Sequence, residues 1–261
     1  MQHRDKLQDI EVQIMINIDR ELQHFNSNDP NSLIRKWFNS KGISKPRISN
    51  KVFTGGVIFL SGESKPTYSG WGITVFPKQK TLNNVYIGQY SKGKRDGQGK
   101  RLMRTFVYLG EYSMDSKHGQ ATMINAETGE LIFKGTFNMD KMHGKCFWKD
   151  PSHEFSGEIN NQIYHGPCTI RYPNGDVFKG TMKNGNIEGH GTLEYGNGDK
   201  YEGEFKKNIM HGRGMYTWYN GESYDGQFID GKIRGEGVMR SPIGTTAKGD
   251  FSSKRVPFEL N

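Results

Sequence analysis

The sequence has no long apolar run. Only 33% of its 261 residues are hydrophobic, and the mean hydropathy is −0.78. A membrane-spanning helix requires about 20 consecutive apolar residues, and no stretch approaches that length. The first residues lead into an acidic segment without a signal-peptide core. The sequence therefore predicts no transmembrane span and a cytoplasmic location.

A concentration of charge of one sign is also missing. The net charge is +8, and the basic residues are not gathered on an element shaped for a nucleic-acid groove. Nucleic acid is therefore excluded as an expected partner. A mildly positive surface favours acidic partners without naming one.

Glycine and aromatic residues are abundant instead. Glycine accounts for 34 residues and aromatics for 12%. Both occur in a sequence motif, here called the phrase, that recurs every 22 to 25 residues. It reads aromatic, any residue, glycine, any residue, aromatic, and then Gly-x-Gly. The leading aromatic residues are Tyr86, Tyr108, Phe133, Phe155, Phe178, Tyr201 and Tyr224. A fixed period of this length indicates a repeat architecture.

The phrase divides the chain into three regions. Residues 1–50 form an N-terminal arm and linker, residues 51–251 hold eight repeats and a half-unit at 247–251, and residues 252–261 form a tail. The copy at 51–85, with Phe53 and Gly55, is degenerate. The clearest structural positions of the repeat are Tyr86, Gly88, Tyr90, Gly97, Gly99, Tyr201, Gly203, Phe205, Gly212, Gly214, Tyr224, Gly226, Phe228, Gly235 and Gly237.

Each repeat is predicted to form a β-hairpin. Side chains alternate between the faces of a strand, so the rings and glycines share one face and mostly polar residues occupy the other. The glycines leave room for rings to lie over the backbone. The dipeptides Asn174-Gly175, Asn197-Gly198 and Asn220-Gly221 predict hairpin turns between repeats in which both residues have φ > 0. Turns within repeats are expected at Lys92-Gly93, Asn184-Gly185 and Asp230-Gly231.

The N-terminal arm is predicted to be helical. Apolar residues over 4–25 recur at helical spacing, and a second helix is expected to start at Asp29-Pro30 and to stop near Gly42. This arm either covers the ring-rich face of its own sheet or docks onto a partner. The docking candidates are Ile10, Ile14, Ile18, Leu22, Phe25 and Trp37.

The repeated phrase resembles the MORN repeat (membrane occupation and recognition nexus), and Tyr201 to Gly221 is the cleanest copy. The resemblance implies an all-β repeat fold: an elongated, twisted antiparallel sheet of about eight hairpins, preceded here by a short α-helical arm. Ala121 and Cys146 depart from the second glycine of the pattern. MORN arrays occur in ciliary radial spokes, in membrane-tethering junction proteins, in cytoskeletal scaffolds and beside the catalytic domains of some enzymes.

Metal, disulfide and nucleotide sites are not expected. His118, His143, His165 and His211 share one phase of the repeat, but equivalent positions lie two strands apart, roughly 9.5 Å, which is too far to converge on a zinc ion. The same spacing separates Cys146 from Cys168 and exceeds disulfide reach. The Gly-x-Gly pairs enter strands rather than helices, unlike a phosphate loop. No cofactor and no catalytic residue is predicted.

Three functions remain open at this point. The first is a non-catalytic scaffold that binds other subunits of a large cytoskeletal assembly, with a radial-spoke-like component of the ciliary axoneme as the favoured case. The second is a peripheral adaptor that binds acidic phospholipids through a basic patch of Lys92, Lys94, Arg95, Arg101 and Arg104. The third is a targeting subunit of a separate enzyme. An open strand edge near residues 225–251 predicts a partner or self-association there.

Overall fold

The computed structural model describes residues 9–17, 20, 29, 31–43, 47–48, 57–59, 69–75, 85–103, 105–254 and 256. These residues belong to two compact units, 1–141 and 142–261. The docking candidates Ile18, Leu22 and Phe25, the patch residue Arg104 and most of the degenerate copy at 51–85 lie outside the described residues.

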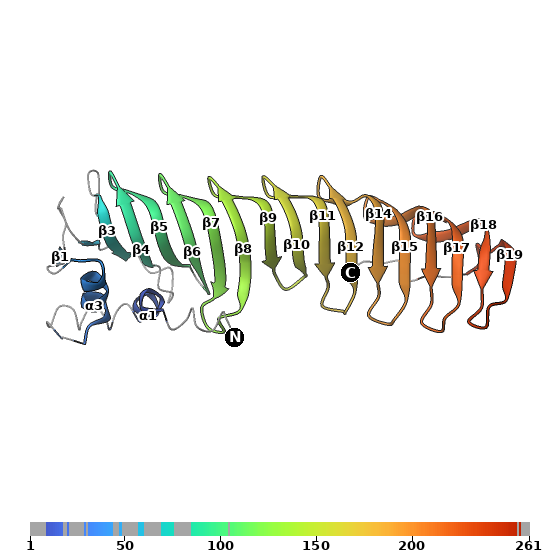
Figure 1. The fold of residues 1–261 in the computed structure, drawn as a ribbon, viewed down its shortest axis with the longest axis horizontal. Coiled ribbons are helices and arrows are strands. Elements are labelled where there is room, and N and C mark those ends of the chain that lie inside the picture. The colour runs from blue at the N-terminus through green and yellow to red at the C-terminus, as the bar shows by residue number, and fades with distance from the viewer. Residues whose placement is uncertain are drawn as a thin grey trace. The chain divides into compact units, whose positions relative to one another are not determined.

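The first unit combines two short helices with a sheet (Figure 1). Its elements are α1 (Ile10–Ile16), α3 (Leu33–Ser40), β1 (Arg47–Ile48), β2 (Val57–Phe59), β3 (Gly70–Val75), β4 (Val85–Ser91), β5 (Lys94–Met103), β6 (Phe106–Ser113), β7 (Ser116–Asn125) and β8 (Leu131–Asn138). Strands β1, β2 and β3 pair in parallel, and β3 to β8 form an antiparallel meander.

The second unit continues the hairpin pattern. Its strands are β9 (Lys141–Lys149), which begins at the unit boundary, β10 (Glu154–Asn160), β11 (Ile163–Arg171), β12 (Val177–Lys183), β13 (Asn186–Ile187), β14 (Gly189–Glu194), β15 (Lys200–Lys206), β16 (Ile209–Thr217), β17 (Ser223–Ile229), β18 (Lys232–Arg240) and β19 (Thr246–Asp250). Neighbours pair antiparallel, and β12 pairs with both β13 and β14. The prediction of an all-β repeat fold with short N-terminal helices is confirmed.

Rings lie over glycine backbone in most repeats, which are those led by Tyr86, Tyr108, Phe155, Phe178, Tyr201 and Tyr224. Gly203 in β15 pairs with Gly214 in β16, and the ring of Tyr201 covers both. A Cβ atom added at Gly203 would lie 2.5 Å from the Gly214 Cα and 2.6 Å from the Tyr201 hydroxyl oxygen. Because no real Cβ contact is that short, only glycine fits beneath this ring.

The first glycine of each Gly-x-Gly pair has a separate role. Gly212 has φ +68° and lies where the register of β15 with β16 shifts, which is the geometry of a β-bulge. The Glu204 carboxylate accepts a hydrogen bond from the Arg213 N–H at 3.1 Å, and the Tyr201 hydroxyl donates to the Glu204 carbonyl at 2.8 Å. The bulge is therefore closed by side chains of the preceding strand.

The predicted turn positions are correct, but one turn type was wrong. Within repeats, both central residues have positive φ, as at Asn184 (51°) and Gly185 (81°), which is the type I′ geometry. Between repeats only the glycine does, as at Gly175 (92°). There the Asn174 side chain accepts the Asp176 N–H at 3.0 Å, a local bond that stabilises Asn174 without positive φ.

The sequence predicted that the face opposite the rings is polar. This prediction holds for the second unit and was wrong for the first. In the second unit the face opposite the rings carries exposed ion pairs such as Lys200–Glu202 at 3.0 Å. In the first unit the same face is apolar, and helices α1 and α3 cover it. The shared core consists of Val12, Ile14, Met15, Ile34, Trp37, Phe38, Ile73, Val85, Ile87, Leu102, Val107 and Ile124.

The second helix starts later than predicted. Ser32 is the N-cap of α3, and its hydroxyl accepts the Arg35 N–H. Asp29 instead forms the preceding turn, where its side chain accepts the Asn31 N–H at 2.8 Å. Gly42, with φ +75°, follows the Lys41 C-cap as the predicted stop.

Substitution of Gly203 by Val tests the ring-over-glycine packing. We expect Gly203→Val to lower the free energy of unfolding by at least the ~1–3 kcal/mol typical of overpacking, because the new Cβ meets backbone as well as the ring. Gly249→Val is the matched control, since Gly249 occupies the same repeat position in β19 and its Cβ would meet nothing within 4 Å. Equal urea midpoints for the two variants would contradict the assignment.

Candidate functional site

The aromatic residues of each unit form an interlocked row, here called the ring face. In the second unit, Tyr201 packs edge-on against Phe205 of its own repeat at 5.1 Å and against Phe228 of the next repeat at 4.9 Å between ring centroids. Tyr224 continues the row with Phe228 at 5.6 Å and Phe251 at 6.0 Å. Edge-to-face pairs of this kind add to the stabilisation from burial. Rings such as Tyr201 and Phe228 therefore join two neighbouring repeats.

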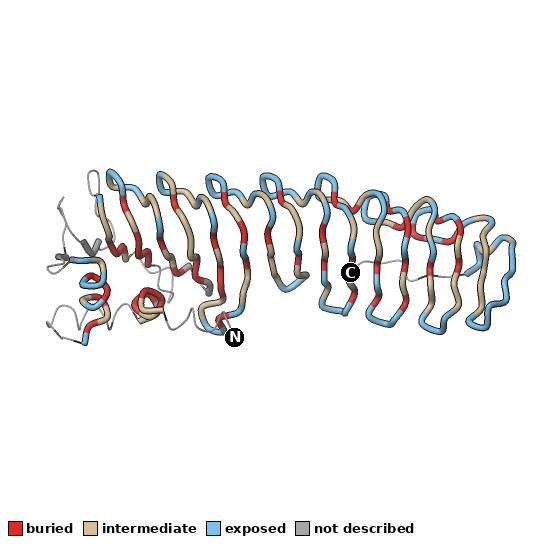
Figure 2. The backbone as a smooth tube through the Cα atoms, in the orientation of Figure 1, coloured by how far each residue is buried: buried red, intermediate tan, exposed pale blue. Residues whose placement is uncertain are grey.

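The first unit repeats this pattern with tyrosines. Tyr112 lies between Tyr86 at 5.2 Å and Tyr108 at 5.1 Å. Its ring-face glycines, Gly88 and Gly99, lie beneath Tyr86. Burial in this unit does not alternate along the strands, because both faces are covered: Val85, Tyr86, Ile87 and Gly88 of β4 are all buried. Figure 2 shows such runs of buried backbone in the strands of this unit.

The row is interrupted in the second unit, which the sequence analysis missed. Ile159 and Met182 occupy the positions of the second aromatic residue. A cavity of about 300 Å³ lies beside Met182, lined also by His153, Tyr164 and Tyr172. The His153 Nε2 and the Tyr164 hydroxyl lie 3.0 Å apart. The signal was present in the phrase itself, because a smaller side chain replaces a ring.

The four described residues of the predicted basic patch lie in two different places on the sheet. Lys92 and Lys94 are exposed at a turn. Arg95 instead lies on the ring face, with its guanidinium carbon 4.8 Å from the centroid of Tyr112, and its Nε bonds Asp115 at 3.0 Å. Arg101 shares that face because it pairs with Tyr86. The described basic residues are therefore divided between an exposed turn and the ring face, and binding of an acidic partner through them stays a prediction.

Burial affects the cations of this face. It lowers the pKa of Arg101, and the nearby Arg95 charge lowers it further. Burial likewise lowers the pKa of Lys117, whose Nζ lies 5.6 Å from the Tyr108 centroid and 5.1 Å from that of Phe137. These side chains pack on rings through cation–π contacts, so they help to build the sheet.

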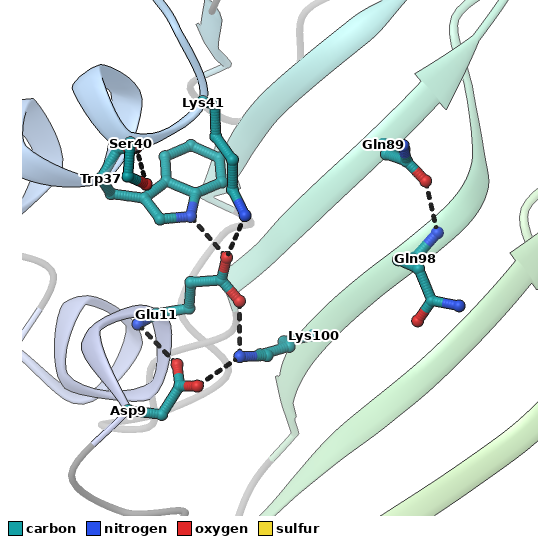
Figure 3. A network of polar contacts seen from close by, with 8 residues as sticks. All are labelled: Asp9, Glu11, Trp37, Ser40, Lys41, Gln89, Gln98 and Lys100. Carbon is teal, nitrogen blue, oxygen red and sulfur yellow. Dashed lines mark hydrogen bonds and ion pairs between the residues drawn. The ribbon is translucent and has the colours of Figure 1, made fainter.

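A charged network fixes the helices to the sheet of the first unit (Figure 3). The Glu11 carboxylate of α1 accepts the Trp37 indole N–H of α3 at 2.5 Å and contacts the Lys100 Nζ of β5 at 2.6 Å. Lys100 also bonds Asp9 at 2.7 Å. Although burial raises the pKa of Asp9, hydrogen bonding and charge attraction from Lys100 outweigh it, so the pKa is lowered. The network joins both helices to one strand.

A groove of about 580 Å³ lies beside this network on the same face of the first unit. Charges of both signs and apolar groups line it, including Glu11, Lys41, Trp71, Lys100, Leu109 and Lys134. The Lys41 Nζ lies over the Trp71 ring at 4.3 Å. Lys41 and Lys100 are already paired with Glu11, so the groove presents mixed chemistry rather than one ligand-specific set.

The described docking candidates lie in the protein's own fold. Ile14 and Trp37 are 0% and 1% exposed within the helix–sheet core, and Ile10 packs against that core. The alternative that the arm covers its own sheet therefore holds for these residues. The covered face is the one opposite the rings, rather than the ring face considered from the sequence.

The cysteines fill the positions predicted for them. Cys146 and Cys168 both pair with Gly157 on its two sides, and both are free and buried. Burial raises the pKa of each thiol to about 11, so neither is a reactive thiolate at neutral pH. Across the described part of the chain, no group of histidine, cysteine and carboxylate side chains is arranged to hold a metal ion.

Arg95→Ala tests whether this cation is structural. We expect a loss of about 1–3 kcal/mol in the free energy of unfolding of the first unit, because the variant removes a half-buried cation–π contact and an ion pair. Lys94→Ala, at the exposed neighbouring position, is expected to change stability by less than about 0.5 kcal/mol. Chemical denaturation of both variants is the measurement, and equal effects would contradict the assignment.

Solved structures show only a remote likeness. The Sas-4 (dCPAP) TCP domain of Drosophila melanogaster, in complex with a proline-rich motif of Ana2, is 11% identical with a TM-score of 0.30, over 64% of this chain and 83% of that chain. The TCP10c domain of Drosophila melanogaster Sas-4 is 10% identical with a TM-score of 0.29, over 64% and 91%. The G-box domain of the microcephaly protein CPAP is 12% identical with a TM-score of 0.26, over 74% and 99%. No curated protein matches the chain.

Family comparison gives a direct result. The MORN repeat model matches residues 86–103, 133–153, 155–177, 178–200, 201–223 and 224–246, together half of the chain. The unmatched segment between the first two matches, led by Tyr108, still forms a hairpin of β6 and β7 with the same ring contacts. None of the described helices is long or apolar enough to cross a membrane. The chain belongs to the MORN-repeat family.

Proposed function

We propose that this chain is a non-catalytic scaffold subunit of a large protein assembly, in which the faces of its repeats bind other protein subunits. The observation that carries the proposal is the run of MORN repeats over half of the chain. MORN repeats are protein-interaction motifs, and the repeat family is generally non-catalytic.

The use of polar groups on the ring face supports this proposal. The hydroxyls of Tyr86, Tyr108 and Tyr201 donate to backbone carbonyls of their own strands at 3.0, 2.8 and 2.8 Å. Burial raises the pKa values of all three tyrosines. These groups stabilise the repeat as neutral donors, and they are poor candidates for acid–base chemistry near neutral pH.

The finer proposal places this assembly in the cytoskeleton, with a radial-spoke-like component of the ciliary axoneme as the specific case. Its support is the resemblance to MORN arrays found in such assemblies. The helical arm is consistent with a scaffold, because its described core residues pack on the sheet.

A membrane adaptor is less well supported by the geometry. Of the five basic residues predicted to contact lipid, Arg95 is stacked between tyrosines and Arg101 shares that face, whereas Lys92 and Lys94 are exposed at a turn. Binding of acidic lipid through exposed turns would be sensitive to salt. A role as the targeting subunit of a separate enzyme is tested by the same experiment, which is described next.

Fractionation of source cells tests the scaffold. We expect the protein to remain in the detergent-resistant, high-salt-resistant fraction, with crosslinks from exposed lysines such as Lys179 and Lys206 to neighbouring subunits. Release by detergent together with lipids would favour the membrane adaptor. Co-purification of an enzymatic activity on a second polypeptide would favour the targeting subunit, and either result would overturn the proposal.

A further inference from the structure

The last strand of the second unit has an open edge. β19 pairs with β18, and among the described residues it has no second neighbour. Such an edge offers a row of unpaired backbone N–H and C=O groups to another chain. Phe251 turns onto the Tyr224 ring, and the Lys254 Nζ lies 3.2 Å from Glu222, so the segment that follows β19 packs against the unit's own rings and residues of the preceding hairpin.

The outward backbone groups of this edge can be identified. The Phe251 N–H donates to the Gly235 carbonyl, and the Ser241 N–H donates to the Thr245 carbonyl. Bonded and non-bonded residue pairs alternate in an antiparallel ladder. The odd-numbered residues of β19 therefore bond to β18, and the N–H and C=O groups of Thr246, Lys248 and Asp250 point outward.

Paired glycines share one register from β15 to β19. Gly203 pairs with Gly214, Gly214 with Gly226, Gly226 with Gly237, and Gly237 with Gly249. A further strand in the same pattern would place a glycine opposite Gly249. Because Gly249 bonds to β18, that next glycine pair would be a non-hydrogen-bonded pair.

The charge pattern of β19 is complementary to itself. If Gly249 lies on a two-fold axis, Lys248 of one copy lies opposite Asp250 of the partner subunit, and the reverse contact repeats it. Both side chains are exposed, and Lys248 makes no ion pair with any described residue. The Asp250 Oδ1 accepts the Ser252 N–H at 2.8 Å and the Ser252 hydroxyl at 2.6 Å, which leaves Oδ2 available. Opposite charges across strands favour pairing, whereas like charges oppose it.

We propose that two copies of this chain pair through β19, antiparallel and with Gly249 on the two-fold axis, so that Lys248 and Asp250 form two reciprocal ion pairs. In a two-fold contact of this kind the β19 edges of both copies are paired with each other, so no third copy can add at this end. The strand has five residues, so the interface is small and the association is weak and reversible. The proposed scaffold role does not require a second copy of the chain as a partner. The self-association is tested on the isolated full chain, so its outcome is separate from that of the scaffold experiment.

Charge reversal tests the pairing. Sedimentation equilibrium of the full chain over rising concentration is expected to show a dimer that weakens with added salt. Lys248→Glu and Asp250→Lys should each weaken self-association about ten-fold or more, because each replaces two attractions by two repulsions. A mixture of the two variants should restore association, since the two substituted side chains then face each other with opposite charge, and the unchanged Lys248 faces the unchanged Asp250. Lys200→Gln, on an exposed ion pair of β15, is the matched control.

A cysteine variant tests the register. The Cβ of Gly249→Cys would meet nothing within 4 Å, and opposite Cβ atoms in such a pair lie about 4.5–5.5 Å apart, so a disulfide can form with little movement. We expect Gly249→Cys to give a disulfide-linked dimer on oxidation, and Ala247→Cys, opposite Phe251 of the partner subunit, to give none. A wild-type chain that stays monomeric, a dimer unaffected by Lys248→Glu, or Gly249→Cys without a disulfide would each overturn the proposal.

Discussion

The packing of an aromatic ring over paired glycines is the constraint on which the rest of this structure depends. A sheet one layer deep has no second layer to bury its apolar side chains against. Here the leading ring lies flat on the backbone of its own hairpin, as Tyr201 does on Gly203 and Gly214, and its edges meet the second rings of two repeats. The glycine pairs thus fix the register, the ring positions and the repeat length together.

A second consequence is that the two faces of a strand can carry different chemistry in different parts of the chain. The leading ring recurs in both units, whereas the side chains of the opposite face differ between them. In the first unit that face is apolar and receives α1 and α3, which are fixed by the contact of Glu11 with Lys100 at 2.6 Å. In the second unit it carries exposed cross-strand ion pairs such as Lys179–Glu194. The helical arm therefore lies where the sheet has apolar side chains on both faces.

Much of the fold could be predicted from the sequence, because the recurring aromatic and glycine residues give the repeat period and the turn positions directly. The hairpins, the ring-and-glycine face and the unpaired cysteines all follow from that period. The arm was harder, since its helical spacing shows an apolar side without showing what covers it. The missing clue was two apolar residues at positions that are polar in the later repeats. Ile87 stands where those repeats have Lys179 and Glu202, and Leu102 stands where one of them has Glu194. The turn type between repeats depended on the Asn174–Asp176 bond, and the division of the basic cluster depended on which face each strand position takes; neither is visible in residue order alone.

The central claim is that each ring stabilises its own repeat and the next one. Hydrogen exchange of backbone amides in Tyr201→Ala tests it most directly, with Tyr219→Ala, a 76% exposed ring, as the control. The account predicts faster exchange in β15 and β16 and also in β17, because Tyr201 contacts Phe228, while Tyr219→Ala matches the wild type. Faster exchange confined to β15 and β16, or equal effects of the two variants, would contradict it.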